Sequence, residues 1–178
     1  MPDLRLRRHD GNGASELLDT LASIYETEYA EEPYEGNPVF SRQAFTERTQ
    51  RQVSADGFTL LVGSVDDQPA GYVFGYTYGP GQWLPGPCDP PPPEEIVQSA
   101  MFFVVELIVR RPFRGNGYAR QLMEGLLAGR TEQFATLCAH PQAKARDIYP
   151  RWGWQEVCKM SAGAMTFDIM AKRQENKA

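Results

Sequence analysis

The sequence predicts an α+β fold whose central sheet is mixed, mostly antiparallel, and contains one βαβ crossover. Residues 99–140 follow the order strand, helix, strand, which joins two parallel strands through a helix. Residues 58–79 and 154–170 each hold two β-rich runs, and such hairpins give antiparallel pairs. We therefore expect both kinds of strand pairing in one sheet.

The N-terminal third predicts one edge strand and two helices. Residues 3–9 alternate leucine with polar residues, and the DGNG that follows is typical of a turn. A first helix is expected to begin near Ser15, and Ser41 has the chemistry of an N-cap for a second helix that ends before Gly57. The apolar residues of the first helix recur at helical spacing: Leu17, Leu18, Leu21, Ile24 and Tyr25.

The middle of the chain predicts a hairpin, a stiff loop and a buried strand. The hairpin at residues 58–79 turns at an Asp-Asp-Gln-Pro sequence. Residues 80–93 hold too many prolines for a central strand or a helix interior, because proline lacks the N–H that both need. Residues 99–109 are apolar enough for a strand buried on both faces.

An amphipathic helix is expected after the glycine turn at residues 115–117, and Gly129 suits its C-terminal end. Its predicted core positions follow helical spacing: Ala119, Leu122, Met123, Leu126 and Leu127. A strand at residues 134–140, a short helix at 141–149 and the terminal strand pair complete the chain.

Length and composition indicate a single folded domain over residues 1–178, with 42% hydrophobic and 23% charged residues. The net charge of −5 disfavours a nucleic-acid partner, since such proteins need a basic surface. The longest wholly apolar run, residues 100–105, is too short to span a membrane. The start of the chain lacks the apolar segment of a secretion signal, so we expect a cytoplasmic protein, and a homodimer remains open.

The glycine turn predicts an anion site. Gly115 and Gly117 remove side chains where a strand becomes a helix, so unpaired backbone N–H groups and the helix dipole can meet a phosphate. Arg114, and with less support Arg110 and Arg111, can add charge-assisted hydrogen bonds. The nucleoside-triphosphate and dinucleotide glycine motifs are both absent. A plain tight turn with solvated arginines is the alternative interpretation.

Residues 107–123, LIVRRPFRGNGYARQLM, resemble the coenzyme A motif of the GNAT (GCN5-related) N-acetyltransferase superfamily, Arg/Gln-x-x-Gly-x-Gly/Ala. Residues 143–157 resemble its second signature through Ala145, Tyr149, Gly153 and Trp154. The resemblance covers residues 58–159 and implies a GNAT-like fold and transfer of the acetyl group of acetyl-CoA, the cosubstrate, directly to a primary amine. No metal is implied, and the three cysteines lack metal-ligand spacing.

The resemblance also implies roles for particular residues. Acetyl-CoA is expected between the strand of Leu107 and Val109 and the strand at residues 134–140. Coenzyme-binding residues are then Leu107, Val109, Arg114, Gly115, Asn116, Gly117, Tyr118, Ala119 and Gln142, although Gln142 replaces the family's frequent asparagine. Tyr149 would protonate the departing thiolate, but Pro150 is expected to kink or end its helix. Glu106, a carboxylate inside an apolar run, is the candidate base, and a structural ion pair is its alternative role.

Other residues are weaker candidates for catalysis. His9 and His140 are poorly positioned as bases. Cys138 and Cys158 would suit a covalent acetyl-enzyme, but buried, unreactive cysteines are the favoured interpretation.

The acceptor is the least defined part of the prediction. Acidic residues between the first two helices suit a small cationic amine, or they form an ordinary solvated surface; they are Glu26, Glu28, Glu31, Glu32 and Glu35. Aromatic residues that could wall this site are Tyr25, Tyr29, Tyr34 and Trp83. Two other functions remain open: a non-catalytic acyl-CoA sensor, and an interaction module that presents residues 85–93, PGPCDPPPP, as a polyproline ligand.

Overall fold

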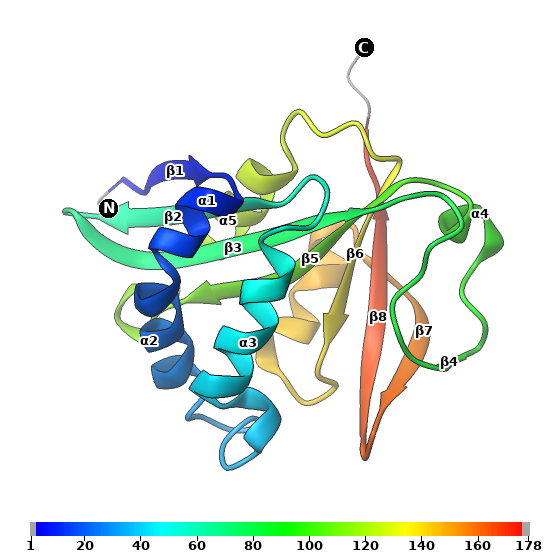
Figure 1. Ribbon diagram of the computed structural model, residues 1–178, viewed down its shortest axis with the longest axis horizontal. Coiled ribbons are helices and arrows are strands. Elements are labelled where there is room, and N and C mark those ends of the chain that lie inside the picture. The colour runs from blue at the N-terminus through cyan, green and yellow to red at the C-terminus, as the bar shows by residue number, and fades with distance from the viewer. Residues whose placement is uncertain (1–2, 176–178) are drawn as a thin grey trace. The chain divides into compact units, whose positions relative to one another are not determined.

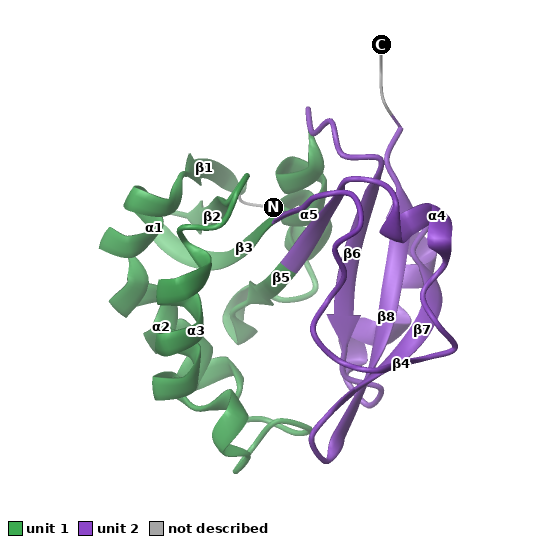
Figure 2. Cartoon of the chain, turned by 45° about the vertical axis from the view of Figure 1, so that its right-hand side comes forward, with its two compact units in different colours: residues 1–76, 105–128 green, residues 77–104, 129–178 purple. Residues whose placement is uncertain are grey.

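The computed structural model describes residues 3–175, which divide into two compact units. Unit 1 comprises residues 1–76 and 105–128, and unit 2 comprises residues 77–104 and 129–178 (Figure 2). Both units are discontinuous in sequence. That residues 1–178 form one domain therefore stays a prediction.

Unit 1 holds the N-terminal elements and the strand and helix that flank the glycine turn. Its elements are β1 (Arg5–His9), α1 (Gly11–Glu16), α2 (Leu18–Glu28), η1 (Pro38–Phe40), α3 (Arg42–Gln52), β2 (Thr59–Val65), most of β3 (Gln68–Tyr78), the second half of β5 (Met101–Val109), η2 (Arg111–Phe113) and α5 (Tyr118–Leu127).

Unit 2 holds the C-terminal strands. Its elements are β4 (Cys88–Asp89), α4 (Glu94–Val97), the first half of β5, β6 (Phe134–Ala139), η3 (Lys144–Asp147), η4 (Tyr149–Trp152), β7 (Gln155–Ala162) and β8 (Met165–Arg173).

Within residues 3–175, eight strands form a sheet in the order β1-β2-β3-β5-β6-β8-β7-β4 (Figure 1). β5 pairs with β6 in parallel, Met101 opposite Phe134 through Val104 opposite Leu137, and α5 connects the two strands. The pairs β1–β2, β2–β3, β6–β8, β7–β8 and β4–β7 are antiparallel. The predicted mixed, mostly antiparallel sheet with one βαβ crossover is confirmed.

In unit 1, helices cover both faces of the sheet. α2 and α3 lie side by side (Figure 1), and their buried residues Tyr25 and Phe45 pack with Tyr72 and Phe74 of β3. The Tyr72 hydroxyl donates to the Leu21 carbonyl at 3.1 Å, which ties α2 to the strand. On the other face α5 packs against β2, and its buried residues are Tyr118, Leu122, Met123 and Leu126.

Several local predictions were wrong. DGNG is a helix start and not a turn: the Asp10 side chain accepts a hydrogen bond from the Gly13 N–H and caps α1. The hairpin reverses over Asp66 and Asp67 alone, both with positive φ, so β3 already begins at Gln68. The predicted helix at residues 141–149 is replaced by two 3-10 turns that meet at Ile148.

The proline-rich segment is partly ordered by the sheet of unit 2. Cys88 and Asp89 pair with Met160 and Lys159 of β7 and so form a short edge strand. Edge strands tolerate nearby prolines, because only one side of the strand requires hydrogen bonds.

None of the helices in residues 3–175 has the length and apolar character needed to cross a bilayer.

Candidate active site

The connection from β5 to α5 adopts an open turn that only glycine adopts freely. Gly115 has φ +82° and Gly117 has φ +75°, and a Cβ atom at either position would meet nothing within 4 Å. The Asn116 side chain donates to the carbonyls of Phe113 at 3.1 Å and Arg114 at 3.3 Å. The Asn116 side chain thus stabilises the turn by binding two of its backbone carbonyls.

The N-terminus of α5 lacks a capping side chain. Gly117 occupies the N-cap position and can offer none, whereas Asp10 caps α1 and Ser41 caps α3. The first N–H groups of a helix have no partner inside the helix, and the helix dipole adds partial positive charge there. The backbone at Ala119 and Arg120 is therefore suited to an anion such as a phosphate.

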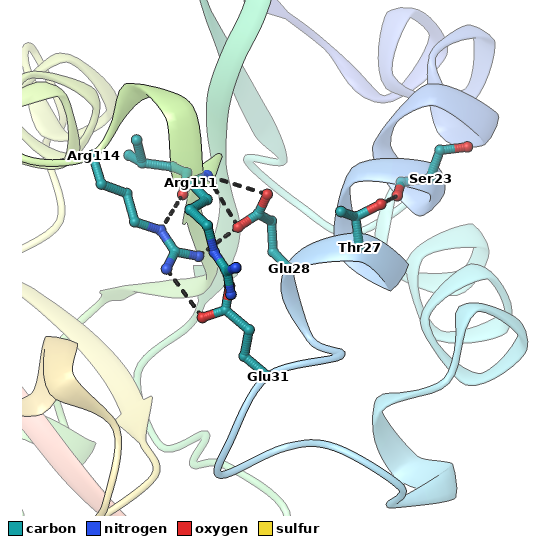
Figure 3. A network of polar contacts seen from close by, with 7 residues as sticks. Ser23, Thr27, Glu28, Glu31, Arg111 and Arg114 are labelled. Carbon is teal, nitrogen blue, oxygen red and sulfur yellow. Dashed lines mark hydrogen bonds and ion pairs between the residues drawn. The ribbon is translucent and has the colours of Figure 1, made fainter.

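The arginines beside this turn bind carboxylates of the same unit. Figure 3 shows Arg111 and Arg114 turned toward Glu28 at the end of α2 and toward Glu31 just beyond it. Arg114 pairs with Glu28 and, at 3.2 Å, with Glu31, while its Nε donates to the Val109 carbonyl at 3.0 Å. Arg111 donates from Nε to Glu31 at 2.8 Å, and its backbone N–H reaches Glu28 at 3.2 Å.

This network alters two expectations from the sequence. The two arginine charges are balanced by two carboxylates, so attraction of a phosphate falls mainly to the backbone N–H groups. Some burial acts to raise the pKa of Glu31, but hydrogen bonds from Arg111 and Arg114 outweigh it and hold that pKa below its usual value. Glu26 likewise pairs with Arg42 at 3.3 Å. Three of the five acidic residues expected near the acceptor are thus bound to arginines.

The other predicted coenzyme residues fall into two groups. In unit 1, Val109 packs with Val65, Ala70 and the buried Tyr118, and Leu107 is half-buried on β5. In unit 2, Gln142 is exposed, and its backbone N–H donates to Nδ1 of His140 at 3.2 Å.

Glu106 lies in an aromatic environment in unit 1. It is half-buried on β5, and the Tyr29 hydroxyl donates a short hydrogen bond to its Oε1. Burial raises the pKa of Glu106 to about 7, although the Tyr29 hydrogen bond and the charge of Arg48 act to lower it. A carboxyl group with a pKa near 7 can exchange a proton efficiently at neutral pH.

The tyrosines around Glu106 form a stack. The ring of Tyr25 lies 4.0 Å from that of Tyr29, which lies 4.4 Å from that of Tyr34. Burial and then the nearby Glu106 charge raise the pKa of all three hydroxyls, which therefore stay protonated at neutral pH. Part of this stack could be expected from the sequence, because Tyr25 and Tyr29 are four residues apart at the C-terminal end of α2, where Tyr29 is the C-cap. Nothing in the sequence indicated Arg48, which donates to the Tyr25 hydroxyl at 3.2 Å.

Tyr149 is buried in unit 2 at the first position of η4. Its ring meets those of Trp152 and Trp154 edge-on, with centroids 5.9 and 6.2 Å away. Pro150 follows at a position where a 3-10 turn needs no N–H, and η3 ends at Asp147. The break expected near Pro150 therefore falls just before Tyr149.

Cys138, Cys158 and His140, the remaining nucleophile and base candidates, have the contacts of structural residues. Burial raises the pKa of the Cys138 thiol to about 12 and that of the Cys158 thiol to about 12, so neither is a thiolate at neutral pH. The His140 ring meets that of Phe167 edge-on at 6.2 Å. These contacts favour the structural interpretation of all three residues.

Comparison of the fold with solved structures finds acetyltransferases. Aminoglycoside 6'-acetyltransferase type Ii has 15% identity and a TM-score of 0.65, with 98% of this chain and 99% of that chain covered. Ard1 from Thermoplasma volcanium has 14% identity and a TM-score of 0.65, with 97% and 99% covered. The paia N-acetyltransferase from Thermoplasma acidophilum, in complex with coenzyme A, has 13% identity and a TM-score of 0.57, with 97% and 99% covered.

Because these sequence identities are low, the three structures show a similar fold and nothing about the activity of this chain. A search of curated protein sequences finds no match. The family model described as "Acetyltransferase (GNAT) family" matches residues 16–154, which include β5, the glycine turn, α5 and Tyr149. The chain therefore belongs to the acetyltransferase (GNAT) family.

Proposed function

We propose that the chain is an N-acetyltransferase that moves the acetyl group of acetyl-CoA directly to a primary amine. The observation that carries this proposal lies on one strand of unit 1. β5 bears Glu106, whose carboxyl group has a pKa of about 7, and it ends in the glycine turn that opens toward an anion. A proton acceptor and an anion site thus share one rigid element.

The proposed reaction has one carbon–nitrogen bond forming as one carbon–sulfur bond breaks. The ammonium group of the acceptor loses a proton to Glu106, and the free amine attacks the thioester carbonyl. The thiolate of CoA leaves and takes a proton from the Tyr149 hydroxyl. The nitrogen of the new amide loses its second proton, which restores the Tyr149 hydroxyl through solvent, and Glu106 releases its own proton to solvent. The high pKa values of Cys138 and Cys158 favour this direct route over an acetyl-enzyme.

The coenzyme is proposed to bind through the backbone of the glycine turn. The N–H groups at residues 115–120 and the dipole of α5 would receive the pyrophosphate. Leu107 and Val109 would offer the edge of β5 to the pantetheine arm, and Gln142 is the further residue that the family resemblance assigns to the coenzyme. The solved paia N-acetyltransferase has a similar fold and is in complex with coenzyme A, which supports coenzyme A as the ligand proposed here.

The acceptor is proposed to be a small molecule whose ammonium group faces Glu106. One of the solved structures is named an aminoglycoside 6'-acetyltransferase, so amino sugars belong in the test panel. The segment at residues 26–35 supports a highly cationic acceptor less than its composition suggests, because Glu26, Glu28 and Glu31 already pair with arginines.

The two alternatives have less support. A polyproline ligand requires a free extended segment, but Cys88 and Asp89 within residues 85–93 pair with β7. An acyl-CoA sensor would need no group poised to accept a proton, whereas Glu106 has a pKa of about 7.

Release of free thiol from acetyl-CoA, measured over a panel of primary amines, tests the proposal. We expect amine-dependent thiol release and acetylated amine detected by mass spectrometry. Tight acetyl-CoA binding with no turnover for any amine would instead favour the sensor.

Gly117→Val is expected to weaken acetyl-CoA binding by at least about tenfold, or roughly 1.4 kcal/mol, because its side chain would block approach to the backbone. Calorimetric titration measures this affinity. Gly129→Val is a matched control, since Gly129 has φ +74° and also nothing within 4 Å of its Cβ position. Equal affinity loss in both variants would assign the effect to backbone strain and not to the coenzyme site.

Arg114→Ala is expected to weaken acetyl-CoA binding by about threefold, with a smaller deficit at high salt, because two of its five N–H donors remain for a phosphate. The same change leaves the buried Glu28 carboxylate without its guanidinium, which we expect to lower stability by about 1–3 kcal/mol. Titrations at two salt concentrations and thermal melts measure both effects. Arg5→Ala removes an exposed surface pair with Asp67, away from the glycine turn, and should change neither.

A further inference from the structure

A second site in unit 1 lies beside α3, outside the glycine turn. A pocket of about 310 Å³ is lined by Arg48, Arg51, Gln52, Ala55 and Tyr76. The first three belong to α3 and its last turn, and Tyr76 comes from β3. Two guanidinium groups, an amide and a phenol therefore border one small space.

Neither arginine has a carboxylate partner among the residues that the structure describes. In residues 3–175, no Asp or Glu oxygen forms an ion pair with Arg48 or Arg51, although Arg42 on the same helix pairs with Asp19 and Glu26. Arg48 and Arg51 are three residues apart, so their side chains lie on one face of the helix and repel each other. An anion in the pocket would relieve this repulsion and accept hydrogen bonds from both groups.

Two hydrogen bonds hold the Arg48 guanidinium in place and leave some of its N–H groups available. One terminal nitrogen donates to the Val39 carbonyl at 2.7 Å and the other donates to the Tyr25 hydroxyl at 3.2 Å. A guanidinium has five N–H groups, so three remain for a ligand. Because Arg48 is half-buried and anchored at two points, little side-chain freedom would be lost on binding.

The same contacts connect the pocket to the proposed base. Tyr25, which receives the hydrogen bond from Arg48, stacks on Tyr29 at 4.0 Å, and Tyr29 donates to Glu106. The charge of Arg48 also acts to lower the pKa of Glu106, so the two groups lie within electrostatic range without forming an ion pair. A molecule that carries an ammonium group and a carboxylate would match the charges at the two ends of this chain of contacts, Glu106 and Arg48.

We propose that the pocket lined by Arg48 and Arg51 binds the carboxylate of the acceptor, which is therefore an amino acid or a short peptide. This inference rests on the proposed function, because it takes Glu106 as the group that meets the amine. A carboxylate fits two guanidinium groups and an amide, whereas a purely cationic amine would be repelled by both arginines.

The test compares ligands that differ only in the carboxylate. Proteinogenic amino acids and simple dipeptides are each paired with their carboxamide, and binding to the full chain is measured by calorimetry with CoA present. We expect at least one acid to bind about tenfold more tightly than its amide. Arg51→Gln removes a guanidinium that lines the pocket and that forms no ion pair within residues 3–175, so it should weaken the acid about tenfold and leave the amide unchanged. Arg7→Gln, an exposed arginine on β1, is the matched control and should change neither.

Binding and turnover separate the two proposals. If acids bind with the expected Arg51 dependence but no amine is acetylated, the carboxylate site stands and the proposed function is wrong. If amines are acetylated but no acid is preferred to its amide, the carboxylate site is wrong. Inorganic phosphate that binds with the same Arg51 dependence, while every amino acid fails to bind, would also overturn the assignment.

Discussion

Tyr149→Phe is expected to lower kcat by about a hundredfold or more, while the Kd for acetyl-CoA changes by less than about threefold. The departing CoA thiolate needs a proton, and a phenol supplied by the family's second signature is the proposed donor. Phenylalanine keeps the ring that packs edge-on against Trp152 and Trp154 and removes only the hydroxyl. Loss of the proton donor should therefore appear in turnover and not in coenzyme affinity.

Steady-state kinetics with the best amine of the panel and calorimetry with acetyl-CoA measure the two quantities. Tyr78→Phe is a suitable control in unit 2, because Tyr78 is a half-buried strand tyrosine whose ring meets Phe103 at 6.0 Å. Nearly full turnover in Tyr149→Phe would remove Tyr149 as the acid and leave the coenzyme site as proposed. A loss of affinity as large as the loss of turnover would assign Tyr149 to binding.

The sequence predicted elements whose hydrophobic period is long and regular. Leu122, Met123 and Leu126 are buried on α5 as predicted, because ten helical residues repeat one period. Residues 10–13 were misassigned because the same residue types favour both turns and helix caps; only the bond from Gly13 to Asp10 distinguishes them. Residues 141–149 lack a long period and form two 3-10 turns, and Pro150 has no N–H with which an α-helix could continue past Tyr149.

The candidate site was predictable where it depends on local backbone. The positive φ of Gly115 and Gly117 follows from their place between a strand and a helix. Long-range pairs were not predictable: the Arg114 bond to Glu28 spans 86 positions, and the Tyr29 bond to Glu106 spans 77. A single sequence does not show which residues far apart along the chain contact each other in the fold. The charges near the turn were therefore predicted individually, and their mutual neutralisation was not.

Glu106→Gln is expected to lower kcat/KM by about a hundredfold near pH 8, where the wild-type carboxylate is ionised and a typical amine is still protonated. With a pKa of about 7, Glu106 becomes protonated as the pH falls, so wild-type activity should decline with a midpoint near that value. The difference between the two proteins should shrink below pH 7. It should also shrink near pH 10, where free amine forms without a base.

The same substitution should change stability with a sign opposite to its effect on activity. The folded-state pKa of about 7 lies above the usual 4.5, so the folded protein holds this proton more tightly than the unfolded chain. Wild-type stability is therefore lost as the pH rises from about 4.5 through 7. Glutamine carries no charge and can still accept the Tyr29 hydrogen bond. Glu106→Gln should thus exceed the wild-type free energy of unfolding by less than about 1 kcal/mol at pH 5 and by up to about 3 kcal/mol at pH 8.

Thermal melts at pH 5 and pH 8 measure this difference, and Asp168→Asn provides a contrast. Burial acts to raise the pKa of Asp168, but hydrogen bonds from Lys159 and Arg146 outweigh it and lower that pKa, so its substitution should destabilise the protein at pH 8. If Glu106→Gln were also destabilising at pH 8, Glu106 would be ionised and well paired near neutral pH. A carboxylate so stabilised holds a proton too weakly to serve as the base, and the amine would have to lose its proton elsewhere.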